Sequence, residues 1–229
     1  MKRITLLVLF CLTAAACGDK PKSSAEYIYA SSLHKNYSSY YYKGDSKMAD
    51  ITFYKALDAF QRMDSVCNIS RLYITKYVLA EQEASSDELA KASAYSELAE
   101  CVDEKLIISF LAGDSIKDTD DLEKPFSLIA EFMKTGKYSA LLSYADDGNT
   151  NPDSKVRLYR LIAANLTESE PEKSCELAEK ARVIDSTYGW TLGISRDLAI
   201  MIEAYGKLGR DTSVLIERKR LIDAKLAKN

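Results

Sequence analysis

The stretch YYYKGDSKMADITFYKAL, residues 40–57, has a pattern that indicates the end of one helix, a turn and the start of the next helix. Its key positions are an aromatic residue that ends the first helix, a glycine in the turn, a small residue that starts the second helix, and then an aromatic and a small residue, at Tyr40, Gly44, Ala49, Phe53 and Ala56. Small residues let two helices approach closely, and aromatic residues fill the groove between successive pairs. The stretch therefore predicts an antiparallel helix pair that packs against further pairs.

These intervals resemble those of the tetratricopeptide repeat family. Three other segments carry parts of the same pattern: Tyr205 with Gly209, Ser174 with Ala178 and Ala181, and Phe132 with Gly136 and Tyr138. The regular period of that family is not kept, since we expect the first helices of the pairs to begin near residues 24, 67, 123, 154 and 192. The resemblance implies stacked helix pairs with a concave groove that holds a peptide or a partner protein.

A helical period runs through most of the chain, and four prolines and nine glycines are few for an all-β or loop-rich protein. We expect helices at 24–42, 46–63, 67–83, 86–111, 123–135, 138–147, 154–166, 170–184, 192–208 and 212–227. The predicted fold is all-α, an array of about five antiparallel helix pairs that forms a degenerate tetratricopeptide-like solenoid, with an irregular helical bundle as the alternative. The stretch LAGDSIKDTDDLEK, residues 111–124, interrupts the pattern and predicts a loop near 112–122.

The first residues have the order of a secretory signal peptide. Lys2 and Arg3 precede an apolar run from Ile4 to Ala16, which is shorter than the ~20 residues of a membrane-spanning helix. Small residues directly before Cys17 resemble the lipobox of bacterial lipoproteins, although Ala14 stands where that family usually has leucine. The resemblance implies removal of residues 1–16 and lipidation of Cys17. The alternative is an ordinary signal peptide cleaved near Ala16, which leaves a secreted soluble protein.

The resemblance to lipoproteins also implies a location in the bacterial cell envelope. Gly18 follows the cysteine in place of the aspartate that favours inner-membrane retention, which indicates the outer membrane, facing the periplasm. We expect residues 17–25 to be the lipidated cysteine with a flexible tether and residues 26–229 to be the helical-repeat domain. Loss of Lys2 and Arg3 changes the formal charge from −3 to −5, and an acidic surface argues against nucleic acid as a partner.

The sequence contains little that predicts catalysis. His34 is the single histidine, no partner stands at helical spacing to activate it, and we expect it to be a solvated helix residue. The alternation of acids and amides at 147–153 begins like a calcium loop, but Pro152 occupies the place that needs glycine. No glycine-rich phosphate loop is present. We therefore expect no enzyme activity, no catalytic residue, no cofactor and no metal site.

Two groups of residues are candidates for structure and binding. Cys67 and Cys101 lie equally far from a turn near residue 84, so they would come opposite each other in a helix pair and could form a disulfide in an oxidising compartment. Tyr37, Tyr41 and Tyr42 could line a partner groove, since tyrosine has a broad apolar face and a hydrogen-bonding tip.

These observations favour a lipid-anchored envelope protein whose helical-repeat groove acts as a protein-binding scaffold or assembly factor. Its partners would be the membrane, through the lipid anchor, and another envelope protein or peptide. The alternatives are a small-molecule or solute-binding component of an envelope uptake system, and an enzyme whose residues are not recognisable. Clustered acids of perturbed protonation in a deep pocket would favour the enzyme.

Overall fold

A computed structural model describes residues 24–81, 85–114 and 121–227. Within these ranges the chain is all-α and contains no strand. The helices are α1 (Ala25–Lys43), α2 (Ser46–Arg62), α3 (Val66–Ala80), α4 (Ser86–Leu98), α5 (Val102–Ala112), α6 (Phe126–Thr135), α7 (Ser139–Asp146), α8 (Pro152–Leu166), α9 (Pro171–Tyr188), α10 (Thr191–Lys207) and α11 (Ser213–Leu226). The predicted signal peptide, the predicted lipidation site Cys17 and most of the expected tether lie outside the described residues, as do residues 115–120 of the expected loop.

Local sequence explains where the helices begin and end. The side chain of Ser24 accepts a hydrogen bond from the backbone N–H of Tyr27, and Asp45 does the same for Met48, so α1 and α2 each begin at a capping residue. Two other helices, α8 and α9, begin at prolines. Gly44 ends α1 with a left-handed backbone at φ 73°, which an L side chain rarely adopts.

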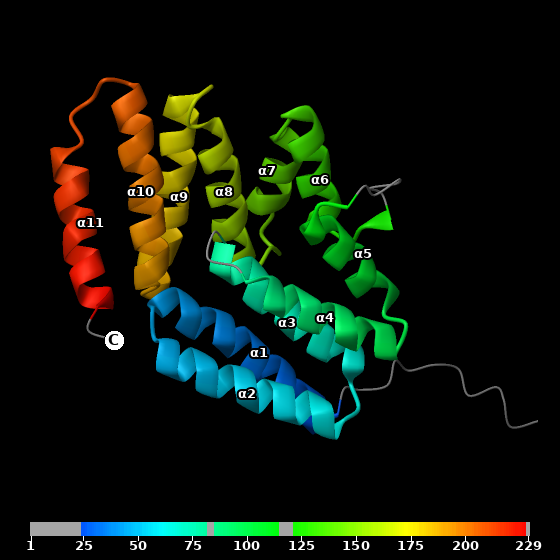
Figure 1. Ribbon diagram of the computed structural model, residues 1–229. Coiled ribbons are helices and arrows are strands. Elements are labelled where there is room, and N and C mark those ends of the chain that lie inside the picture. The colour runs from blue at the N-terminus through cyan, green and yellow to red at the C-terminus, as the bar shows by residue number, and fades with distance from the viewer. Residues whose placement is uncertain (1–23, 82–84, 115–120, 228–229) are drawn as a thin grey trace, which may run out of the picture.

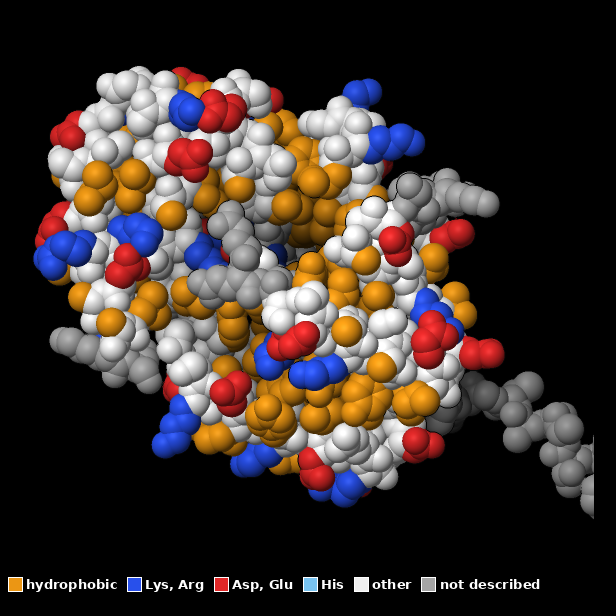
Figure 2. Space-filling model, viewed as in Figure 1, with side chains coloured by type: hydrophobic (Ala, Val, Ile, Leu, Met, Phe, Trp, Pro, Cys, Tyr) orange, Lys and Arg blue, Asp and Glu red, His pale blue; other side chains and the backbone are white. Residues whose placement is uncertain are grey.

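The helices pack as neighbouring pairs, which confirms the predicted fold class. The pairs are α1 with α2, α3 with α4, α6 with α7, α8 with α9 and α10 with α11, and α5 stands between the second and third pair. In Figure 1, α8 to α11 stand side by side, while α1 to α4 form a layer that runs across below them. Figure 2 shows hydrophobic side chains gathered over the lower layer and in the hollow between it and α6 and α7.

One predicted helix is wrong. Residues 86–111 form two helices, because α4 ends at Leu98 and α5 begins at Val102. Glu100 has a positive φ of 50°, and the N–H of Cys101 donates back to the carbonyl of Ser96, so the backbone reverses between the two helices. Hydrophobic period continues through this turn, which is why the sequence pattern alone suggested one helix.

The residues of the quoted stretch do what their spacing predicts. Ala49, Phe53 and Ala56 are all buried on α2, where they face the neighbouring helices. The partial copy in α9 behaves in the same way, since Ser174 is fully buried and its hydroxyl donates to the carbonyl of Ala163 on α8 at 2.8 Å. Small residues therefore bring paired helices close together in both halves of the chain.

The first pair also contacts the last one. Trp190, at the start of α10, donates through its indole Nε1–H to the hydroxyl of Ser39 on α1 at 3.2 Å. Gly44, which ends α1, lies against the end of α11, because a Cβ atom at Gly44 would overlap the side chain of Leu226. The array therefore folds back on itself, and α1 is covered by α10 as well as by α2.

None of the helices in the described ranges combines the length and the apolar character that crossing a bilayer requires.

Candidate functional site

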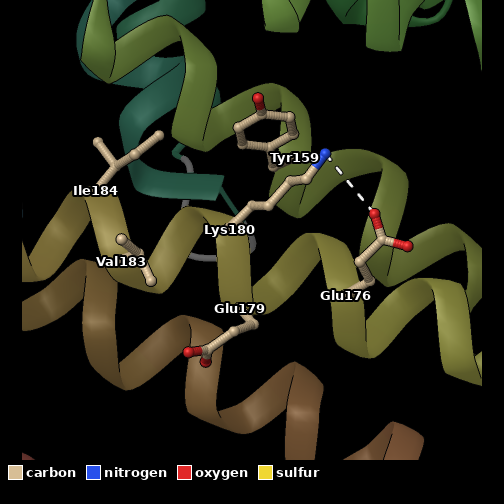
Figure 3. Close-up of a pocket in the computed structure, with 6 residues that line it drawn as sticks. All are labelled: Tyr159, Glu176, Glu179, Lys180, Val183 and Ile184. Atoms are coloured by element: carbon tan, nitrogen blue, oxygen red, sulfur yellow. Dashed lines mark ion pairs between the residues drawn. The ribbon is translucent and has the colours of Figure 1, made fainter.

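A surface cavity lies over the middle of α9. It has a volume of about 430 Å³ and opens to solvent, and its lining residues are Tyr159 of α8 and Glu176, Glu179, Lys180, Val183 and Ile184 of α9. In Figure 3 the ring of Tyr159 stands above Lys180, and Val183 and Ile184 lie to one side of it. Glu179 points away from the ring of Tyr159 (Figure 3). The cavity therefore has an apolar floor and charged groups on its rim.

Hydrogen bonds and ion pairs hold this floor in place. The hydroxyl of Tyr159 donates to Asp146 Oδ1, at the end of α7, at 2.5 Å. Burial, together with this hydrogen bond, raises the pKa of Tyr159, so the phenol stays neutral. Lys180 Nζ lies 5.7 Å from the centre of the Tyr159 ring and 3.7 Å from Glu176 Oε1. An apolar floor beside paired charges is suited to binding an apolar side chain.

A second polar cluster is buried where α8, α9 and α10 meet the ends of α1 and α3. Arg160 of α8 is 4% exposed and donates through Nη2 to Asp185 Oδ2 on α9 at 2.5 Å and through Nε to Asp197 Oδ1 on α10 at 2.7 Å. Both aspartates are 0% exposed. One arginine thus joins three neighbouring helices by charge-assisted hydrogen bonds.

The N-terminal half completes this cluster. The guanidinium carbon of Arg160 lies 5.2 Å from the centre of the Tyr42 ring of α1, a cation–π arrangement. Glu81, which follows α3, places Oε1 3.7 Å from Arg160 Nη1 and 3.1 Å from Arg196 Nη1. Arg196 also donates to the backbone carbonyl of Leu79 at 3.1 Å. Charged groups of α8 and α10 therefore bind the ends of α1 and α3.

Burial shifts the pKa values of the ionisable groups in this cluster. Burial raises the pKa of Asp185 and that of Asp197 above their ordinary values, against the opposing effect of Arg160. Both carboxyl groups bind the same guanidinium, and the negative charge of Asp185 further raises the pKa of Asp197, which favours one proton held by the pair. Burial has the largest single effect and lowers the pKa of Arg160, but Asp197, Tyr42, Asp185 and Glu81 together outweigh it and the pKa rises, so the arginine stays charged.

The cluster has the clustered acids that we associated with an enzyme, but it has no access to solvent. Asp185 and Asp197 are completely covered, and a Cβ atom at Gly193 of α10 would overlap the side chain of Asp185. A substrate cannot touch these acids in this conformation. The geometry of the cluster indicates a junction that holds α8, α9 and α10 against the ends of α1 and α3.

The predicted tyrosine groove is wrong for two of its three residues. Tyr37 is 2% exposed and Tyr42 is 0% exposed, so both belong to the core. Tyr41 is half-buried, and Arg196 lies over its ring and donates to its hydroxyl at 3.3 Å. The physical reason is that Tyr37 packs against Phe53 of α2, whereas Tyr42 packs against the start of α10, which an open array would leave away from α1.

His34 is also not the solvated residue that we expected. Its Nε2 lies 2.8 Å from the hydroxyl of Thr75 on α3. Burial, together with Arg71 and Arg157 nearby, lowers its pKa to about 4. The imidazole is therefore neutral at pH 7 and takes part in packing α1 against α3.

The cysteines that were paired from their spacing are bonded in the structure. A disulfide joins Cys67, in the first turn of α3, to Cys101, between α4 and α5, with 5.5 Å between the two Cα atoms. Since both sulfur atoms are used in this bond, neither is a thiolate that could hold a metal beside Glu104. Cys175 of α9 has a free thiol.

Sequence reasoning missed the cavity over α9. Tyr159 appears in the sequence beside the apolar stripe of α8, and Val183 and Ile184 appear in the run RVID, but none of them stands in a recognisable motif. The buried cluster of Arg160 was also missed, and the signal for it is a charged residue inside a largely apolar segment. Arg160 and Asp197 are such residues, and both are buried.

Comparisons with protein-family models, with curated proteins and with solved structures find no match to this chain.

Proposed function

We propose that this chain is a lipid-anchored envelope protein that holds a segment of a partner protein in the cavity over α9. The observation that carries the proposal is the open cavity of about 430 Å³ with an apolar floor and paired charges on its rim. Protein–protein interfaces concentrate affinity in a few apolar anchor side chains that enter such depressions, surrounded by a polar rim.

The floor of the cavity supports a partner side chain of apolar character. Val183 is 51% exposed, although it lies beside Ile184 and the buried ring of Tyr159. Covering one large apolar side chain of a partner contributes about 1.5–3 kcal/mol. Lys180 and Glu176 then select the polar groups that flank this side chain, because an unmatched charge at the rim loses its hydration without a replacement.

The proposed lipid anchor at Cys17 also supports binding of a partner protein. Acyl chains on Cys17 contribute about 0.8 kcal/mol for each buried CH₂ group, so two or three chains hold the domain at a membrane surface. A protein that is confined to this surface meets other envelope proteins at a high effective concentration, and a shallow site is then sufficient for binding.

Two variants test the cavity. Val183→Glu places a charge on the apolar floor, and Ile216→Glu on α11 is its matched control, because both parent residues are 51% exposed. After chemical crosslinking in intact cells, we expect Val183→Glu to lose the partner that the parent protein and Ile216→Glu retain. Equal recovery of the partner with both variants would exclude the cavity as the binding site.

The anchor is tested separately by replacing Cys17 with alanine. We expect the parent protein to sediment with membranes and the Cys17→Ala protein to be released from them. A Cys17→Ala protein that remained wholly in the membrane fraction would contradict lipid anchoring.

A further inference from the structure

The five helix ends nearest to the tether lie together at one end of the lower layer. Glu26 at the start of α1 pairs with Arg62 at the end of α2, with 3.1 Å between Oε1 and Nε. Three residues then lead from α2 to α3, and the disulfide joins the first turn of α3 to the turn between α4 and α5. We call this group of helix ends, the starts of α1, α3 and α5 with the ends of α2 and α4, the tether end.

The tether end exposes large apolar side chains. Ile28 of α1 is 60% exposed, Leu98 at the end of α4 is 75% exposed, and Val102 at the start of α5 is 67% exposed. Tyr27 and Tyr29, beside Ile28, are 37% and 51% exposed. Residues of these types are usually removed from water, and here they occur on both sides of the tether end.

The length of the chain before α1 limits what can cover these residues. Six residues separate Cys17 from Ser24, the capping residue of α1, so seven Cα-to-Cα steps join the two. A fully extended chain spans at most about 3.5 Å for each residue, so the tether reaches about 25 Å. If Cys17 is acylated, the start of α1 therefore stays within about 25 Å of the membrane surface.

The charges of the tether end determine the kind of lipid. Arg62 is paired with Glu26 and also with Asp58, and Lys105 is paired with Glu97 at 2.9 Å. Three more acids on these turns have no ion-pair partner in the described part of the chain: Asp64, Glu100 and Asp103. Since the excess charge is negative, an anionic lipid surface is repelled and a zwitterionic one is not.

We propose that the tether end is a membrane-contact surface, at which Ile28, Leu98 and Val102 enter the headgroup region of a zwitterionic lipid layer beside the anchor. This proposal rests on the proposed lipid anchor and adds an orientation to it. Apolar and aromatic side chains at this depth lose contact with water, while the neighbouring carboxylates remain in it. The domain is then oriented with the tether end toward the membrane.

Tryptophan reporters test this orientation. Val102→Trp places a reporter at the tether end, and Val214→Trp at the start of α11 is the matched control, because the parent valines are 67% and 68% exposed. The α4–α5 turn and the start of α11 lie at opposite edges of the view in Figure 1. The acylated full-length proteins are reconstituted in phosphatidylcholine vesicles that contain brominated acyl chains, which quench tryptophan only on close approach.

We expect the added fluorescence of Val102→Trp to be quenched and shifted to the blue, and that of Val214→Trp to be unchanged. The signal of Trp190, which is 5% exposed, is measured in the parent protein and subtracted. Replacing part of the phosphatidylcholine by phosphatidylglycerol should weaken the quenching. Leu98→Trp is a second reporter in case Val102→Trp fails to fold.

Flotation of the parent protein with the vesicles separates the two proposals. Flotation without quenching at positions 98 and 102, or with equal quenching at position 214, overturns the membrane-contact surface and leaves the anchor in place. A parent protein that does not float overturns the anchor, and the membrane-contact surface with it.

Discussion

Replacing Arg160 by methionine should destabilise the protein strongly. The substitution keeps much of the side-chain volume but removes the cation that binds Asp185 and Asp197, both of which are 0% exposed. Loss of one partner from a buried ion pair costs about 3–5 kcal/mol, because the remaining charge is buried without compensation. For a domain of this size, each kcal/mol corresponds to a fall in Tm of about 2–4 °C, so we expect a decrease of about 6–20 °C.

Circular dichroism during thermal and urea unfolding measures this change. The matched control is Arg220→Met on α11, where the side chain of Arg220 is 63% exposed and pairs with Glu217 at 2.7 Å. Solvent screens such a pair, so its loss should leave the unfolding midpoint unchanged. If Arg160→Met also unfolded within about 1 kcal/mol of the parent, the junction would not depend on this cluster.

The same cluster predicts how stability depends on pH. Because burial raises the pKa of Asp197, the folded protein holds a proton there at pH values at which the unfolded chain has lost it. The free energy of unfolding should therefore fall as the pH rises from about 4 through the pKa of the folded state. Asp197→Asn cannot ionise, and we expect its stability to be less dependent on pH over that interval. An unchanged pH profile would contradict the shared proton.

Three further predictions concern other parts of the fold. Replacing Cys67 and Cys101 by serine should reduce the free energy of unfolding by about 4 kcal/mol, because the disulfide closes a loop with a sequence separation of 34; a urea midpoint equal to that of the parent would refute this. The pKa of His34 is lowered to about 4, so the unfolded chain binds more protons than the folded protein does between pH 4 and 6.5. The free energy of unfolding should therefore fall as the pH falls through that range, and His34→Gln should flatten this pH profile. Gly193→Ala should lower Tm, because its Cβ would overlap Asp185, whereas Gly206→Ala in the same helix meets nothing within 4 Å and should stabilise the protein by about 0.4–1 kcal/mol; equal effects of the two substitutions would show that the overlap is relieved without cost.

The sequence predicts the helix pairs well because their signals are local. Gly44 in the turn and Ala49, Phe53 and Ala56 at helical spacing describe contacts between segments that are adjacent in the chain. The break at Glu100 was missed because apolar residues continue on both sides of it, and the reversal depends on a single residue with positive φ.

The return of the array onto itself could not be predicted in the same way. The contact of α1 with α10 joins Ser39 to Trp190, 151 residues apart, and neither residue belongs to a repeated pattern. Tyr42 was expected at a groove because that contact was unknown, and its buried ring packs against Trp190 with 5.4 Å between the ring centres. The cavity over α9 was missed for a similar reason, since Tyr159 and Asp146 meet only after α7 and α8 have packed.

Site-specific photocrosslinking in intact cells, with a photoreactive residue at position 183 or at position 216, tests the partner-binding cavity most directly. Val183 and Ile216 are equally exposed, so the two positions differ only in what surrounds them. We expect one discrete protein adduct from position 183, none of the same size from position 216, and a weaker adduct when Cys17 is replaced by alanine. Equal adducts from both positions, or no adduct from position 183, would contradict a partner-binding cavity on a membrane-anchored array.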